Sequence, residues 1–155
     1  MNKASLAALA ALVALAAVVT GCGGGGDTTE ATVTLTKTEF IKQGDAICKK
    51  GNEESEKEAE EFAEDNDFEL EKASKEQLEE AVSEVLVPSL ERQTEELGEL
   101  GAPEGDEDKV EAIIVSLEDA TGEIEDDPGL VFQDGVLKKP SQLADSYGFK
   151  VCGEE

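Results

Sequence analysis

The chain contains no histidine and no tryptophan, and it has one methionine and one tyrosine among its 155 residues. A serine or cysteine nucleophile usually needs a neighbouring base, which is most often histidine. Sites for haem, copper and structural zinc depend on histidine, methionine or free cysteine. These absences argue against nucleophilic catalysis and against those metal sites. We therefore expect a protein that is not an enzyme and that has no cofactor.

Carboxylates are abundant, but they do not by themselves predict catalysis. Glycoside hydrolysis by paired carboxylates also needs a substrate cleft and a carboxyl group in an apolar pocket. A small acidic helical bundle offers little room for either. We interpret adjacent acids such as Glu60-Glu61 and Glu95-Glu96 as solvated helix faces.

Basic residues are scarce. Thirteen lysine and arginine residues stand against 38 aspartate and glutamate residues, which gives a formal net charge of −25. Binding to nucleic-acid phosphates or to an anionic lipid surface requires a basic footprint. We therefore expect no nucleic-acid partner and no docking on a membrane through the protein surface.

The only long apolar run lies near the N-terminus. It covers residues 4–19, follows Lys3, and is short for a spanning helix of about 20 residues but suitable for a signal-peptide core. The next residues, Val19-Thr20-Gly21-Cys22, resemble the lipobox of bacterial lipoproteins. This resemblance implies cleavage after Gly21 and lipidation of Cys22. An uncleaved N-terminal anchor helix is the alternative.

A lipid on Cys22 would place the protein on the extracytoplasmic face of the cell membrane, with shedding or secretion as an alternative. Two or more acyl chains give stable anchoring where one chain does not. Removal of residues 1–21 takes away Lys3 and no acidic residue, so the mature chain of 134 residues has 12 basic and 38 acidic residues and a formal charge of −26.

Three segments follow from these patterns. Residues 1–21 are predicted to be a lipoprotein signal peptide, residues 22–35 a Gly/Thr-rich tether, and residues 36–153 an acidic helical domain. The tether has an expected reach of about 20 Å. The alternation of Val33 and Leu35 with threonines leaves a short strand as an alternative there.

Helical signals dominate the rest of the chain. Ser or Thr followed three residues later by Glu or Gln, the spacing of a capping box, occurs at Thr36 and at Ser74. The pattern predicts an all-α fold, a small bundle of three longer helices plus a short C-terminal helix. Apolar residues recur at helical spacing in three segments, starting near residues 40, 78 and 110, and the short last helix starts at Pro140-Ser141.

Single proline, aspartate and glycine residues within this pattern give further expectations. Pro88 should kink or restart the second helix, and Asp106 is a plausible cap for the third. Residues 130–137 contain an Asp-Gly turn and predict a loop or a small hairpin. Gly44 and Gly51 lie on the buried face of the first helix, where each weakens the helix, so we expect another element to approach closely there.

Once Cys22 is assigned to lipid, Cys48 and Cys152 remain as a pair. Disulfides persist outside the cytoplasm, so we predict that these two are bonded and join the first helix to the C-terminus. A reactive or metal-binding thiol pair is the alternative. It is disfavoured by the absence of a CxxC motif and of histidine.

The folded region resembles a group of small actinobacterial lipoproteins that have no assigned activity. The order of a cysteine on the first helix, a proline within the middle helix and a Tyr-Gly before the last cysteine carries this resemblance. The residues are Phe40 with Asp45-Ala46-Ile47-Cys48, Pro88, Leu97-Gly98-Glu99-Leu100-Gly101-Ala102-Pro103, and Tyr147-Gly148-Phe149-Lys150-Val151-Cys152. The resemblance covers residues 36–153 and implies a helical extracytoplasmic fold.

Two clusters of acids suggest oxygen ligands for calcium. They are Asp65, Asp67 and Glu69, and Glu104, Asp106 and Asp108. Neither has the glycine at position six and the glutamate at position twelve of an EF-hand loop, so we interpret both as polar loops and predict no metal site.

Two hypotheses for function remain. The first is a non-catalytic interaction or structural module with an envelope protein as partner, and the alternative is a binding protein for a divalent cation or small cationic ligand.

Overall fold

The computed structural model describes residues 34–133 and 135–153. The predicted signal peptide, Cys22 and the tether up to residue 33 lie outside the described residues. The described part is helical with connecting turns, and it contains no strand. The prediction of three longer helices and a short C-terminal one is confirmed. None of the helices described is long and apolar enough to cross a bilayer.

The first helix, α1, extends over Lys37–Asp65. Its capping box is formed as predicted, because Thr36 Oγ1 accepts a hydrogen bond from the Glu39 amide at 3.3 Å, and the Glu39 carboxylate accepts one from the Thr36 amide at 3.0 Å. Gly44 and Gly51 are both buried on this helix. A Cβ atom on Gly44 would lie 2.4 Å from Phe149 Cε1, and one on Gly51 would lie 2.2 Å from Gln93 Cδ. The close approach expected at both glycines is therefore confirmed.

The second long helix passes through Pro88 by way of a π-helical turn. Pro88 has no amide hydrogen, so the usual bond to residue 84 is missing. In the turn just before Pro88, the Val87 amide donates to Val82 O, five residues back, and not to the residue four back as in an α-helix. The disturbance expected at Pro88 thus takes the form of a wide turn just before it. The three parts are α2 at Lys75–Ala81, the π turn η2 at Val82–Leu86, and α3 at Val87–Glu99.

The C-terminal third contains α4 at Glu107–Asp126, the 3-10 helix η3 at Pro128–Phe132, and α5 at Lys138–Tyr147. Of the two alternatives for the connection, the described residues 130–133 and 135–137 form no hairpin, because η3 and a turn occupy them. Asp106 occupies the N-cap position of α4, but its carboxylate does not cap the helix. Instead it bonds to Lys109 Nζ and accepts a hydrogen bond from the Tyr147 hydroxyl at 3.1 Å. The predicted capping role of Asp106 is therefore wrong.

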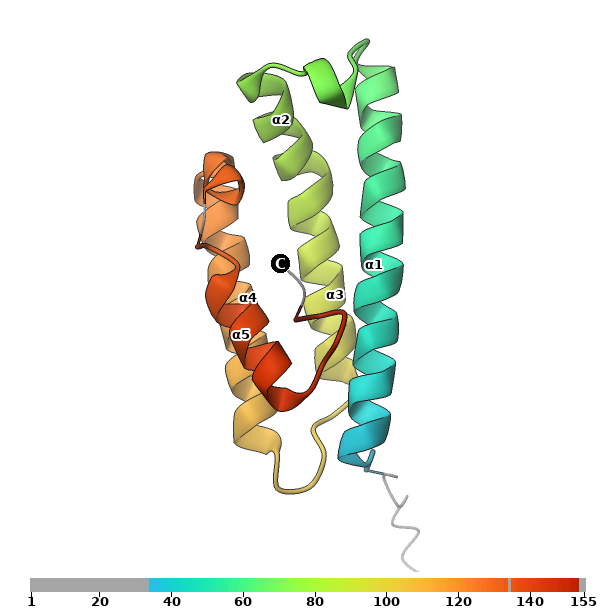
Figure 1. The fold of residues 1–155 in the computed structure, drawn as a ribbon, viewed down its shortest axis with the longest axis vertical. Helices are drawn as coiled ribbons and strands as arrows, with labels where there is room; N and C mark the ends of the chain where they lie inside the picture. The colour runs from blue at the N-terminus through green and yellow to red at the C-terminus, as the bar shows by residue number, and fades with distance from the viewer. Residues whose placement is uncertain (1–33, 134, 154–155) are drawn as a thin grey trace, which may run out of the picture. The chain divides into compact units, whose positions relative to one another are not determined.

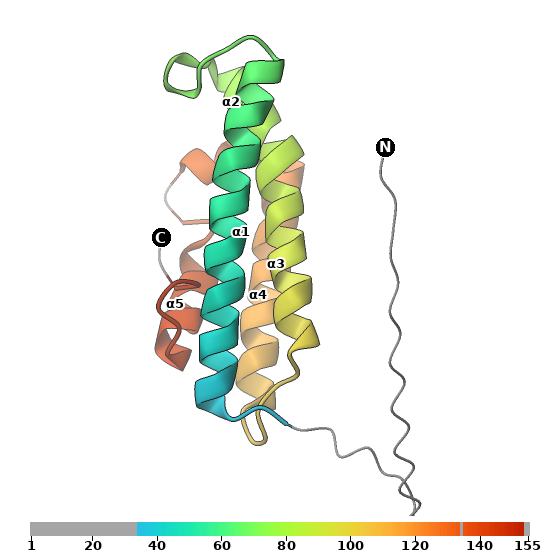
Figure 2. The ribbon, with the colours of Figure 1, turned by 90° about the vertical axis from the view of Figure 1, so that its right-hand side faces the viewer.

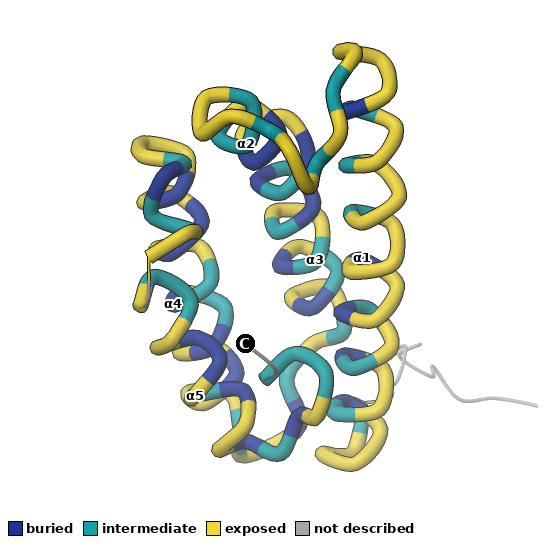
Figure 3. The backbone as a smooth tube through the Cα atoms, turned by 45° about the horizontal axis from the view of Figure 1, so that its top comes forward, coloured by how far each residue is buried: buried dark blue, intermediate teal, exposed yellow. Residues whose placement is uncertain are grey.

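The helices α1, α3 and α4 lie side by side along the long axis of the domain, and each runs antiparallel to the one before (Figures 1 and 2). The short helix α5 packs on α4 and covers only the half of the bundle near the start of α1 (Figure 1). Buried positions lie on the faces that the helices turn to one another, whereas the outer face of α1 is exposed (Figure 3).

The buried apolar residues form two clusters of unequal size. The larger one lies at the end that α5 covers and contains Phe40, Cys48, Leu97, Val110, Ile113, Ala144, Tyr147 and Phe149. The smaller one, Val82, Val87 and Ile124, lies toward the other end. We call the end of the domain around α2, η2 and η3 the distal end. It has the smaller buried core and no counterpart of α5 in the described part of the chain.

Candidate functional site

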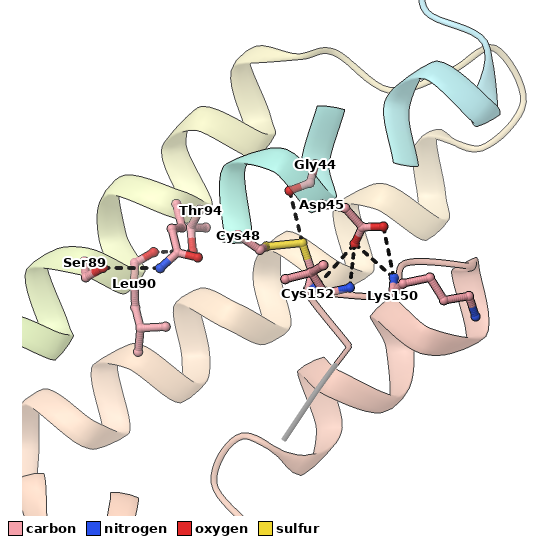
Figure 4. The surroundings of a disulfide bond; sticks show 10 residues. Gly44, Asp45, Cys48, Ser89, Leu90, Thr94, Lys150 and Cys152 are labelled. Carbon is pink, nitrogen blue, oxygen red and sulfur yellow. Dashed lines mark hydrogen bonds between the residues drawn. A yellow bond between two sulfur atoms is a disulfide. The ribbon is translucent and has the colours of Figure 1, made fainter. Parts of the chain in front are cut away.

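The C-terminal segment is tied to α1 by a disulfide and by one carboxylate (Figure 4). Cys48 and Cys152 are bonded, as predicted, with their Cα atoms 5.3 Å apart. One turn earlier on α1, the Asp45 carboxylate accepts hydrogen bonds from the amides of Lys150, Val151 and Cys152 at 2.8–3.3 Å. Cys152 Sγ also lies 3.3 Å from Gly44 O, but a disulfide sulfur carries no hydrogen to donate. This arrangement stabilises the end of the chain and offers no open site.

A second polar cluster surrounds the only tyrosine. The Tyr147 ring is buried, lies edge-on to Phe40 with 6.0 Å between centroids, and has Lys37 Nζ 4.1 Å from its centroid. Burial, and then the hydrogen bond to Asp106, raise the pKa of Tyr147 to about 12. The bond from Lys109, together with that from Tyr147, lowers the pKa of Asp106. With both polar groups engaged, the cluster connects the N-cap of α4 to α5.

Neither acidic cluster singled out in the sequence converges on a point. Glu69 pairs with Lys72 and Asp106 pairs with Lys109. Asp67, at the end of α1, has a positive φ of 58° in a turn that closes the helix. Within residues 34–133 and 135–153, no group of three or more acidic or cysteine side chains is arranged to hold a metal ion.

An acidic groove lies between α3 and α4. Its volume is about 580 Å³, and its lining consists of Glu91, Thr94, Glu95, Glu118, Thr121, Gly122 and Glu125. The four glutamates are exposed, and none forms an ion pair with another described residue. Both threonines are buried, and the Thr121 hydroxyl has no hydrogen-bond partner. We call this site the acidic groove.

An apolar groove lies at the distal end, between α1 and the α2–η2 segment. Its volume is about 260 Å³, and its lining consists of Ser55, Glu56, Ala59, Leu78, Ala81, Val82, Val85, Leu86 and Phe132. Phe132, on η3, is 52% exposed and is one of two large apolar side chains in the described part that are markedly exposed, the other being Val115. We call this site the distal groove. The distal groove differs more from its surroundings than the acidic groove does, because its lining is apolar while the surface around it is dominated by acids.

The sequence places the apolar residues of the distal groove on helices but does not bring the helices together. In the fold Ala81, Val82 and Val85 are buried, and only Leu78 and Leu86 of the second helix are half-buried in the groove lining. The spacing of the apolar residues gave no signal of the π turn, because Leu86 and Leu90 are four residues apart, as in a regular helix. The π turn adds one residue to the helical turn before Pro88. Phe132 gave no signal either, because its exposure depends on where η3 packs.

No protein-family model, no curated protein and no solved structure matches this chain. The likeness to small actinobacterial lipoproteins therefore stays a prediction from the residues quoted above.

Proposed function

We infer that the protein is a lipid-anchored, extracytoplasmic, non-catalytic interaction module. The observation that carries this is the distal groove, which is lined mainly by apolar side chains and includes the half-exposed Phe132, on a domain whose charge would otherwise favour solvation on all sides. Accessible apolar patches rimmed by polar residues mark interaction sites in soluble domains. The disulfide and the Asp45 bonds keep the helical frame rigid, and a rigid frame lowers the entropic cost of binding.

The interaction function is tested by photo-crosslinking in intact cells. A photoreactive phenylalanine analogue replaces Phe132, and the same analogue at Val115, the other exposed apolar position, is the matched control. We expect a discrete crosslinked envelope protein from position 132 and none from position 115. Equal products at the two positions, or none at either, would contradict the proposal.

The predicted anchor needs its own test, because Cys22 lies outside the described residues. Intact mass of the protein extracted from membranes should show a chain that begins at Cys22 and carries diacylglycerol, together with a two-hydrogen change on reduction of the Cys48–Cys152 bond. Replacement of Cys22 by serine should release the protein from the membrane. An unprocessed leader in the mature protein would overturn the assignment.

The acidic groove favours a second candidate function, the binding of a small cationic ligand. Glu91 and Glu95 are separated by about 6 Å along α3, and Glu118 and Glu125 by about 10 Å along α4, at 1.5 Å per residue. Carboxylates spread in this way suit a linear polyamine better than a single ion. The Thr121 hydroxyl is a buried polar group without a hydrogen-bond partner, and Thr121 belongs to the groove lining.

Thermal melts in spermidine, calcium and sodium chloride at equal ionic strength test this second function. We expect spermidine to raise the melting temperature beyond the salt effect, and Glu118→Gln with Glu125→Gln to abolish the excess. Glu111→Gln with Glu123→Gln makes the same charge change on exposed positions of α4 outside the groove, so it should retain the excess. Identical shifts in all three solutions would exclude specific binding.

A further inference from the structure

We propose that the distal groove binds a basic amphipathic helix of a partner protein. The inference rests on the proposed interaction function and names the chemistry of the partner. Its basis is the shape and lining of the groove, its place in the bundle, and the charges at its edge.

The dimensions of the groove fit a short helical segment. Its apolar wall on the second helix extends from Leu78 to Leu86, which is about 12 Å at 1.5 Å per residue, or roughly two helical turns. Ala59 on α1 forms the opposite side, and its small side chain leaves room for larger ones. A helix with apolar residues at positions i, i+4 and i+7 presents side chains over that length, which is the usual pattern for a helix bound in a groove.

The place of the groove in the bundle explains why it is open. Toward the start of α1, α5 and the segment after it supply Tyr147 and Phe149 to the larger core. At the distal end the described chain supplies only η3 (Figure 1). Phe132 of η3 is half exposed. The smaller cluster there contains three buried residues, against eight in the larger one. An added helix would complete the distal end as α5 completes the other.

Charge at the edge of the groove indicates a basic partner. Glu56 lines the groove and forms no ion pair within the described residues, and neither does Glu60, one turn further along α1. Four neighbouring acids of α1 are paired with lysine or arginine, namely Glu53, Glu54, Glu58 and Glu61, whereas Glu64 and Asp65 at the end of the helix are not. A lysine or arginine beside the apolar face of a partner helix would therefore find a free carboxylate.

Other occupants fit less well. A second copy of this chain would bring a like charge of −26, which opposes association. An anionic lipid surface is repelled for the same reason. The segment from residue 22 to residue 33 contains no basic residue and is mostly glycine, threonine and acid, so it lacks both the charge and the apolar stripe.

The test uses the full mature chain, lipid-anchored in phosphatidylcholine nanodiscs, with empty discs as the reference. The probe is a labelled peptide of about 18 residues built from leucine and lysine, with all leucines on one helical face. Its isomer with the leucines scattered around the helix is the control peptide. We expect the amphipathic peptide to bind, by fluorescence anisotropy, at least about fivefold more tightly than its isomer.

Protein variants locate the site. Phe132→Ala removes an exposed anchor and should weaken binding about fivefold or more, whereas Val115→Ala should leave it unchanged. Glu56→Lys should weaken binding about threefold and reduce its dependence on salt. Glu54→Lys makes the same charge change on the opposite face of α1 and should have a smaller effect. Circular dichroism of each variant establishes that the fold is retained.

Equal binding of the two peptides, or binding indifferent to Phe132→Ala, overturns the proposal. If position 132 crosslinks an envelope protein in cells but the amphipathic peptide does not bind, the basic-helix inference fails while the interaction function stands. If position 132 gives no specific product and the peptide does not bind, both fail. A crosslink at position 132 to a second copy of this chain or to lipid also overturns the inference.

Discussion

Tyr147 shows how one side chain connects packing, hydrogen bonding and titration. Its ring packs with Phe40 and Phe149, and its hydroxyl donates to Asp106 Oδ2. Both effects favour the neutral phenol, because burial penalises the phenolate and Asp106 repels it. The pKa therefore rises to about 12 in the folded protein, whereas the unfolded chain keeps an ordinary value near 10.

The titration of Tyr147 is directly measurable, because it is the only tyrosine and the chain has no tryptophan. We expect the absorbance at 295 nm to rise with a midpoint near pH 12 in the folded protein and near pH 10 in denaturant. Since the folded pKa is the higher one, its stabilising contribution is complete below about pH 10 and is lost as the pH rises toward 12. Tyr147→Phe should remove this alkaline loss. A folded midpoint near 10 would contradict the burial.

Three helical glycines should respond differently to alanine. Gly44→Ala should destabilise the domain by about 1–3 kcal/mol, because the new methyl group would overlap the fully buried Phe149 ring. Gly51→Ala meets only the flexible Gln93 side chain and should cost less. Gly122→Ala has open space around it and should stabilise by up to about 1 kcal/mol through helix propensity. Urea denaturation measures all three, and destabilisation by Gly122→Ala would contradict the expectation.

At the scale of elements, the C-terminal segment depends on α1 for its position. The three amides that bond to Asp45 belong to consecutive residues, so one carboxylate orders the chain up to the disulfide. A bond that closes a loop of 104 residues stabilises by up to about 5 kcal/mol in the chain-entropy model. The Asp45 hydrogen bonds and the disulfide are adjacent, so their contributions to stability are expected to be coupled.

Asp45→Ala should lower the free energy of unfolding of the oxidised protein by about 1.5–3 kcal/mol, because a half-buried carboxylate that accepts several amides is lost. Asp145→Ala is the matched control. Its carboxylate is exposed and makes a single ion pair of 3.9 Å with Lys150, so its removal should cost almost nothing. Urea unfolding without reductant separates the two, and equal effects would show that Asp45 does not hold the segment.

The second long helix illustrates what local patterns can and cannot predict. The capping box at Ser74 was recognisable and forms as expected. Pro88 indicated that the helix would be disturbed but not in what form, since a kink, a restart and a π turn can each accommodate a residue without an amide hydrogen. The form depends on packing: the extra residue brings both Val82 and Val87 into the distal cluster. Similarly, Asp106 was expected to cap α4, but lysine and tyrosine partners compete for its carboxylate.

At the scale of the whole molecule, negative charge dominates. Most ion pairs of the described part join exposed side chains, such as Lys49 with Glu53 and Lys57 with Glu61, and pairs of this kind contribute little to stability. With 38 acids against 13 bases in the chain, self-repulsion acts against the compact state. The disulfide and the buried aromatic cluster oppose this repulsion.

Stability should therefore increase with monovalent salt. Raising sodium chloride from about 0.1 M to about 1 M shortens the Debye length from about 10 Å to about 3 Å and screens the repulsion between acidic helices. We expect a higher melting temperature of the oxidised protein in calorimetry, with potassium chloride giving the same rise. A fall in melting temperature would mean that the surface ion pairs outweigh the net repulsion.

The sequence by itself determined the elements, because apolar spacing, capping boxes and proline act over a few residues and need no distant partner. It also determined the disulfide, since only Cys48 and Cys152 remained once the predicted lipid anchor took Cys22. Only the tertiary structure decided which apolar side chains are left uncovered, because that depends on where α5 ends its contact with the bundle. It also decided that the acids of α3 and α4 share one groove, since two antiparallel helices bring together residues far apart in the chain.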